Sequence, residues 1–214
     1  MRLFIEYLIS DPLYFFSWIL ALAFSITVHE FSHAAAALRL GDDTAARSGH
    51  LSFNPLVQMG ASSLLMMLLV GIAWGRVPVD LRRLRTARAH AMVALAGPVT
   101  NFLLCALFGI MAGGAARLES LLALPALETA RYFLRVAARV NGILFVLNLL
   151  PLPMLDGWAA LCAFWPRLLY LESRTAQTVS MVGVLLIFFS PAGNLVWGGG
   201  LRLAAFFVSL LPPA

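Results

Sequence analysis

Charged residues are scarce in this sequence, and lysine is missing altogether. Only 12% of the 214 residues are charged, whereas 61% are apolar and the mean hydropathy is +0.89. All 15 basic residues are arginine, and they cluster at the ends of apolar segments, as the positive-inside rule for membrane proteins describes. The net charge of +5 is therefore no sign of nucleic-acid binding, and we expect no nucleic-acid partner. Several apolar runs approach or exceed the ~20 residues that cross a bilayer, which predicts a single integral-membrane domain over residues 1–214.

Cysteine is nearly absent as well. The two cysteines, Cys105 and Cys162, lie in apolar stretches, and neither has CxxC spacing or the spacing of metal ligands. Such placement is typical of thiols that pack in a hydrophobic interior. We therefore expect both to be packing residues.

One short polar group interrupts the first long apolar run, residues 13–40. It reads His29-Glu30-Phe31-Ser32-His33, and a spacing of four places the two histidines on one face of a helix. Two neutral imidazoles so placed can hold one zinc ion and leave positions for a third ligand and a water, from which Glu30 can take a proton. A glutamate at the centre of an apolar helix costs roughly 2.5–3.5 kcal/mol on the insertion scale, so the group needs a compensating partner. The pattern is the HExxH signature of zinc hydrolases.

Local signals divide the remaining chain into helices and loops. Asp11-Pro12 is an N-cap followed by a first-turn proline and Gly41 is a C-terminal glycine, so a helix is predicted over residues 13–40. Further spans are predicted at residues 91–113, 130–150, 175–190 and 195–211, with a short loop over 114–129.

Two segments do not fit a simple span. Residues 56–74 are apolar but short and contain glycine and serine, which predicts a thin span or a re-entrant hairpin. The polar residues 41–55 are expected to hold a small β hairpin around Ser48-Gly49, and residues 75–80 to be extended. Within residues 91–113, Asn101 is expected to hydrogen-bond across helices, and Gly109 and Gly113 form a small-xxx-small pair.

A catalytic zinc needs a third protein ligand, and few candidates are embedded in apolar sequence. Asp156 is the best, because it follows a helix broken by Pro151 and Pro153, and irregular backbone at membrane depth is tolerated where it lines a cavity. The simpler reading is an N-cap aspartate for a helix starting at Gly157. His50 and His90 are the alternative ligands.

Three blocks in this order resemble the site-2 protease family of intramembrane zinc metalloproteases. They are the HExxH group, then residues 96–101 (AGPVTN), then residues 148–157 (NLLPLPMLDG), which are similar to the family's NxxPxxxxDG pattern. The resemblance covers roughly residues 20–165. It implies His29, His33 and Asp156 as zinc ligands, Glu30 as the catalytic base, and Asn148 near the scissile carbonyl as an oxyanion donor.

The resemblance also implies the substrate and the organisation of the chain. It implies one Zn²⁺ per chain, a transmembrane protein as substrate, and a catalytic core over about residues 13–165 followed by a helical hairpin over 175–211. Residues 41–55 and 75–80 are similar to the family's membrane-associated β elements. No PDZ or nucleotide-binding regulatory domain is recognised, so a minimal form is expected.

These expectations combine into one fold class and one topology. We expect an all-α polytopic protein of a bacterial inner membrane, with about five to six transmembrane helices and a small membrane-associated β hairpin or re-entrant segment. The metal site must join the C-terminal half of the first helix to Asp156, so that helix and the one over 130–150 should run parallel. The arginines at residues 76–88 predict that the C-terminal ends of both helices lie near the cytoplasmic face.

Two non-enzymatic functions are the alternatives. A transporter or other metal-binding membrane protein could use the same His/Asp cluster, and an inactive scaffold could bind transmembrane partners. Glu30 discriminates against the first, because a pure binding site needs no carboxylate beside the first histidine that is not itself a ligand. The inactive scaffold is disfavoured because the catalytic base and all three candidate zinc ligands are present: Glu30, His29, His33 and Asp156.

Overall fold

Every secondary-structure element in the described part of the chain is helical. The computed structural model describes residues 3–122, 124–171, 178, 182–183, 190–191 and 193–212. The helices are α1 (Tyr7–Ser10), α2 (Pro12–Arg39), α3 (Thr44–Arg47), α4 (Pro55–Val70), α5 (Ala87–Leu122), α6 (Pro125–Asn148), α7 (Asp156–Phe164) and α9 (Gly193–Ser209), with 3₁₀ turns at Phe4–Glu6, Leu81–Arg83 and Pro166–Leu171.

The predicted boundaries of α2 are confirmed at both ends. The Asp11 side chain accepts a hydrogen bond from the Tyr14 amide at 3.0 Å, and Pro12 occupies the first turn. At the other end Leu40 is the C-cap and Gly41 has φ of +104°, a conformation that favours glycine. The 28 residues make a rod about 42 Å long, enough to cross a bilayer.

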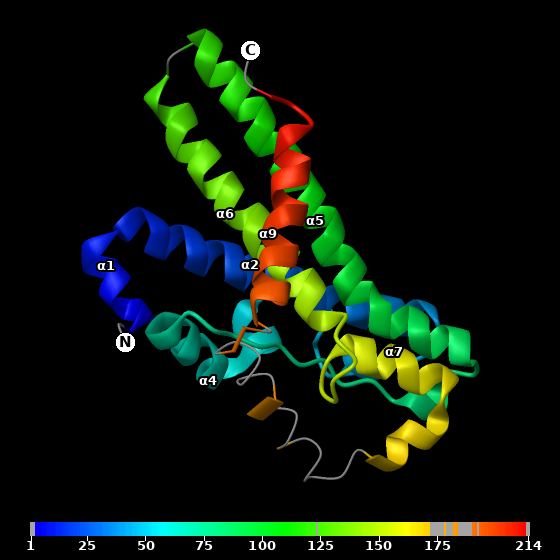
Figure 1. The fold of residues 1–214 in the computed structure, drawn as a ribbon. Coiled ribbons are helices and arrows are strands. Elements are labelled where there is room, and N and C mark those ends of the chain that lie inside the picture. The colour runs from blue at the N-terminus through cyan, green and yellow to red at the C-terminus, as the bar shows by residue number, and fades with distance from the viewer. Residues whose placement is uncertain are drawn as a thin grey trace.

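Helices α5 and α6 form a long antiparallel hairpin on which α2 and α9 pack (Figure 1). In Figure 1, α2 and α6 both run from the left side of the view towards the right, which is the shared direction predicted for two helices that lead to one metal site. Glycines allow α9 to approach closely: Gly142 lies against the Gly200 backbone, and Gly113 against the backbone of Val208 and Leu211. The predicted packing role of Gly109 and Gly113 is thus confirmed, with α9 as the partner.

Two described helices are long and apolar enough to cross a membrane, Pro12–Arg39 and Ala87–Glu119. Helix α6 carries Glu128 and three arginines, and α9 has only 17 residues, so neither is among them. Their assignment as spans stays a prediction. The predicted span 175–190 lies almost entirely outside the described residues.

Two sequence predictions about loops are wrong. The loop expected over residues 114–129 is largely helix, since α5 continues to Leu122 and α6 begins at Pro125. The β hairpin expected within residues 41–55 is also absent: Thr44–Arg47 is the short helix α3, and no strand occurs in the part of the chain that the structure describes. Alanine at two of its four positions favours helix, and the Arg47 side chain pairs with Asp43 one turn earlier.

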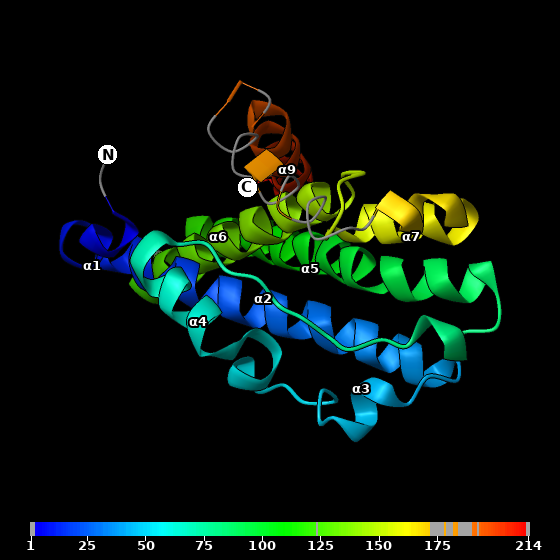
Figure 2. The same ribbon diagram turned by 90° about the horizontal axis from the view of Figure 1, so that it is seen from below.

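Helix α4 and residues 72–80 lie along one side of α2 (Figure 2). Gly60 breaks α4 with φ of +73° and ψ of +165°, and Gly71 ends it in the left-handed region. Residues 72–80 are tied down at three points: Ser63 Oγ bonds to both backbone groups of Trp74, the Arg76 amide donates to the Gln58 carbonyl, and the Asp80 amide donates to Asp42 Oδ2. Residues 72–80 have no regular secondary structure, and Asp80 has extended backbone angles (φ −96°, ψ +99°). The extended conformation of the rest of residues 75–80 and the crossing or re-entry of α4 stay predictions.

Candidate active site

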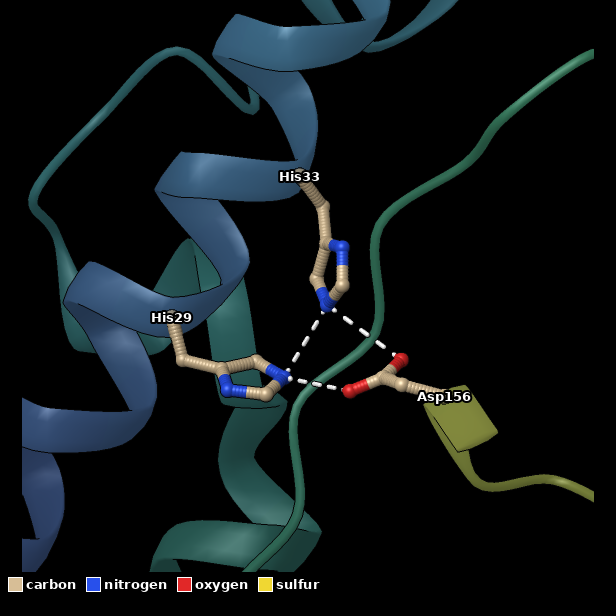
Figure 3. A group of neighbouring side chains, drawn as sticks. All are labelled: His29, His33 and Asp156. Atoms are coloured by element: carbon tan, nitrogen blue, oxygen red, sulfur yellow. Dashed lines mark hydrogen bonds and ion pairs between the residues drawn. The ribbon is translucent and has the colours of Figure 1, made fainter. Parts of the chain in front are cut away.

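His29, His33 and Asp156 come together at the junction of α2 and α7 (Figure 3). The two Nε2 atoms of the histidines are 3.0 Å apart. Asp156 Oδ2 lies 3.0 Å from Nε2 of His29, and Oδ1 lies 3.3 Å from Nε2 of His33. Residues up to 127 positions apart thus bring one potential ligand atom each to within 4.8 Å of one another, and we call this group the metal triangle.

A chain of buried amides fixes which nitrogen of His29 carries the proton. The Asn141 amide nitrogen donates to the Ala137 carbonyl at 2.9 Å, and a carbonyl only accepts. Asn141 Oδ1 therefore faces Asn101, accepting from its Nδ2 at 2.9 Å. Asn101 then presents Oδ1 to His29 Nδ1 at 2.6 Å, so that Nδ1 must donate. The predicted cross-helix hydrogen bonding of Asn101 is confirmed, and its partner is a residue of the HExxH group.

His33 is fixed in the same tautomer by a simpler contact. Its Nδ1 lies 2.7 Å from the carbonyl oxygen of Val93 on α5, which again can only accept. A neutral imidazole held in this way at either position directs the lone pair of Nε2 into the metal triangle. Two lone pairs and a carboxylate at 3.0–3.3 Å cannot satisfy one another without a cation or an added proton.

The triangle also fits zinc in size and in donor type. For tetrahedral bonds of about 2.0–2.1 Å, ligand atoms stand roughly 3.3 Å apart. The two Nε2 atoms are 3.0 Å apart, and each lies 3.0–3.3 Å from a different oxygen of Asp156, distances close to that spacing. Two imidazole nitrogens and one carboxylate are a ligand set that catalytic zinc sites use, with one position left open.

Gly97 on α5 leaves the space that a metal needs. A Cβ at this position would overlap the Nε2 atoms of both His29 and His33. The open side of the triangle is therefore bounded by a helix that approaches it without a side chain. This explains the glycine in the AGPVTN block.

Asp156 does not act as the N-cap that its position in the sequence allowed. It is the first residue of α7, the N-cap is Leu155, and no side-chain cap hydrogen bond forms there. The preceding linker is tight, with Met154 at φ of +78° and Gly157 pressed against the carbonyls of Leu149 and Leu150. This linker turns the Asp156 carboxylate towards the histidines.

Glu30 lies beside the metal triangle but outside it. Its side chain is buried and packs against Gly75 of residues 72–80, where a Cβ would overlap the carboxylate. No hydrogen bond to this carboxylate is seen within the described part of the chain. A carboxylate so placed is available to exchange protons with a water at the site.

The other candidate residues lie apart from the triangle. Asn148 is the last residue of α6 and half-buried, and no hydrogen bond joins it to the described site residues. His50 pairs with the Gln58 side chain at 3.3 Å, and His90 contacts the carbonyls of Leu81 and Leu84 at 2.9 and 2.8 Å. Neither histidine belongs to the metal group, so Asp156 is the better-placed third ligand. Asn141 and Ser25, to which Asn141 also donates at 2.8 Å, were not singled out as partners of the site from the sequence.

Comparison with known proteins agrees with this geometry. The sequence profile of peptidase family M50 matches residues 115–190, a segment that contains Asp156. The chain is 32% identical over 181 residues to "Putative zinc metalloprotease YwhC" of Bacillus subtilis, covering 83% of this chain and 82% of that protein. It is also 33% identical over 181 residues to "Putative zinc metalloprotease Rip2" of Mycobacterium tuberculosis, covering 79% of this chain and 65% of that protein.

A third relative is the Mycolicibacterium smegmatis protein of the same name, 34% identical over 155 residues, which make up 64% of this chain and 52% of that protein. No solved structure matches the chain. The extent and identity of the match to YwhC are sufficient to assign a family: the chain belongs to peptidase family M50, the site-2 protease family.

Proposed function

We propose that this protein is a zinc endopeptidase that cuts peptide bonds in or near the transmembrane segments of other membrane proteins. The observation that carries the proposal is the metal triangle, in which two imidazole lone pairs, fixed by Asn101 and by the Val93 carbonyl, meet the Asp156 carboxylate. An electron-rich triangle of this kind needs a cation or an added proton, and its ligand set is the one that catalytic zinc uses. The Glu30 carboxylate beside it provides the acid–base group that a metal-binding protein without catalysis does not need.

The residues divide the chemistry among them. His29, His33 and Asp156 would hold the zinc, and a bound zinc would polarise the substrate carbonyl and lower the pKa of its water towards ~7. Glu30 would take a proton from a water at the site and deliver it to the leaving amine. Asn101 and Asn141 keep the His29 ring in its ligand tautomer. Asn148 would donate to the developing oxyanion, as the family resemblance implies.

The position of the triangle supports a substrate that lies in the membrane. His29 is 17 residues beyond the start of α2, about 26 Å along a helix that is long and apolar enough to span. A peptide bond in a helix is shielded by its own hydrogen bonds, so a transmembrane substrate must unwind locally. Residues 72–80 run past Glu30, and those of their backbone groups that Ser63, Gln58 and Asp42 do not engage could pair with the unwound segment as an added strand.

The topology proposed for this function places the site near the cytoplasmic face of a bacterial inner membrane. The dense group of arginines between residues 76 and 88 supports a cytoplasmic position for the start of α5. Helix α6 would then return towards the cytoplasm, and α2, which runs in the same direction as α6 (Figure 1), would end there too. We expect a single cysteine at Ser48, in a Cys105/Cys162-free background, to be protected from an impermeant thiol reagent added outside intact cells. Labelling of that cysteine from outside would contradict the topology.

The function is tested by comparing membrane-protein fragments in cells that produce the wild type, Glu30→Gln and Glu6→Gln. Glu6 is an exposed glutamate at the N-terminus, which makes it a matched control. Glu30→Gln should retain zinc and lose cleavage, whereas Glu6→Gln should behave as the wild type. Cleavage retained in Glu30→Gln would exclude Glu30 as the base. Zinc binding without any fragment that depends on Glu30 would favour a metal-binding or transport protein, and absence of both zinc and cleavage from the wild type would favour a scaffold.

A further inference from the structure

A small cavity lies between α2, α6 and α9, towards the opposite end of α2 from the metal triangle. It encloses about 150 Å³ and is lined by Tyr14, Trp18, Trp197 and Arg139, with Val136 and Ile143 among its apolar walls. The rings of Trp18 and Trp197 stack across it, with centroids 6.3 Å apart and planes 27° apart. We call this cavity the aromatic notch.

Arg139 brings a charge to the notch that the described protein does not neutralise. It belongs to a row of three arginines spaced one turn apart on one face of α6, with Arg131 and Arg135 before it. Arg131 pairs with Glu119 at 2.8 Å. No carboxylate lies within ion-pair distance of Arg135 or Arg139 among the described residues. A guanidinium next to apolar and aromatic surface in a membrane protein is costly unless an anion or water satisfies it.

The aromatic residues place the notch at the membrane surface. Tyr14 and Trp18 lie two and six residues after the start of α2, about 3 and 9 Å along its axis. Tyrosine and tryptophan gather at that depth, where one end of the ring is apolar and the other meets the headgroups. Helix α1, directly before it, exposes Tyr7, Leu8 and Ile9, as an interfacial helix does. At that depth the arginines without an ion-pair partner would lie at the level of lipid phosphates.

We propose that the aromatic notch binds the head group of an anionic phospholipid. Arg139 would donate two parallel hydrogen bonds to the phosphate, which suits the fork of a guanidinium, and Arg135 would supply the second positive charge. A volume of about 150 Å³ equals roughly five waters, room for a phosphate and part of the glycerol but not for a whole lipid. The acyl chains would leave the notch along its apolar walls. A basic pocket between helices at the headgroup level is a known form of lipid recognition.

Native mass spectrometry of the full-length, detergent-solubilised protein tests the proposal. Phosphatidylglycerol and phosphatidylcholine are added in turn to the wild type, Arg139→Gln, Arg139→Lys and Arg39→Gln. Arg39 is the matched control, because it is an exposed arginine at the other end of α2 and its replacement removes the same charge. We expect the wild type to retain phosphatidylglycerol in preference to phosphatidylcholine. Arg139→Gln should bind it about tenfold more weakly or worse, since a charge-assisted bidentate contact is lost.

Arg139→Lys keeps the positive charge but lacks the paired donors of a guanidinium, so its affinity for phosphatidylglycerol should be intermediate. This variant also keeps the test valid if Arg139→Gln fails to fold. Arg39→Gln should bind as the wild type does. Equal retention of the two lipids by the wild type would overturn the proposal, as would unchanged binding in both Arg139 variants. An equal loss of phosphatidylglycerol binding in Arg39→Gln would show that the binding depends on the overall charge of the protein, and would also overturn the proposal.

Discussion

The substitution Gly97→Ala should remove the metal while leaving the fold in place. The new Cβ would overlap Nε2 of both His29 and His33, so it would occupy the space between the ligands. Four ligands of a structural zinc together give about 10–16 kcal/mol, or roughly 3 kcal/mol each. Displacing two imidazoles therefore loses about 6 kcal/mol, equal to ~10⁴ in affinity. The helix itself should tolerate the change, because alanine is favoured over glycine in a helix interior by about 1 kcal/mol.

Gly114→Ala on the same helix is the matched control. Its new Cβ would meet only Leu211 Cδ1 at 3.7 Å, an ordinary contact. The assay is zinc affinity, measured by competition with a fluorescent chelator, together with the melting temperature of each purified protein. Gly97→Ala should lose zinc and Gly114→Ala should keep it, both with helical content unchanged. Wild-type zinc affinity in Gly97→Ala would refute the position assigned to α5 at the open side of the metal triangle.

Three further substitutions probe the surroundings of the site. Asn101→Leu should lower zinc affinity by about 10–100-fold in the same chelator assay, because His29 loses the partner that holds its tautomer, and unchanged affinity would remove Asn101 from that role. Asn148→Ala should lower turnover by about 10²–10³ with zinc content unchanged, and an equal loss of zinc or of fold would make Asn148 a packing residue instead. Asp42→Ala should lower the free energy of unfolding by about 1–3 kcal/mol at neutral pH, because the buried carboxylate accepts hydrogen bonds from Thr44 and from the Asp80 amide. Burial acts to raise the pKa of Asp42, but these hydrogen bonds outweigh it and hold the pKa below its ordinary value, so the stabilisation is complete above about pH 4 and is lost as the pH falls through the folded-state pKa. Melting temperatures of the wild type and Asp42→Ala should therefore converge in acid, and a gap that persists at the lowest pH would contradict the assignment.

The sequence was sufficient where the physical signal is local. Asp11, Pro12 and Gly41 fix the ends of α2 because capping and proline geometry act within a few residues. The HExxH spacing places two imidazoles on one face for the same reason. Asp156 could be selected because a carboxylate after a proline-broken helix is unusual in apolar sequence.

The wrong predictions concern segments that contact residues far away along the chain. The predicted span ended at residue 113, yet α5 continues to Leu122, and at Gly113 it packs against the backbone of Val208 and Leu211. Thr44–Arg47 was predicted as a strand, yet it is the helix α3, and Asp42 just before it is held by the amide of Asp80, 38 residues further along the chain. The roles of Gly97 and Asn141 also depend on partners in other helices, which spacing along one chain does not reveal.

The most direct test of the central claim is the zinc-edge X-ray absorption spectrum of the purified protein, read for the atoms around the metal. The metal triangle predicts about one zinc per chain, with imidazole nitrogen and carboxylate oxygen at about 2.0–2.2 Å. In Asp156→Ala the zinc should be weakened or lost. A sulfur neighbour at about 2.3 Å, which only a cysteine such as Cys105 or Cys162 would supply, would contradict the triangle, and so would a spectrum unchanged by Asp156→Ala.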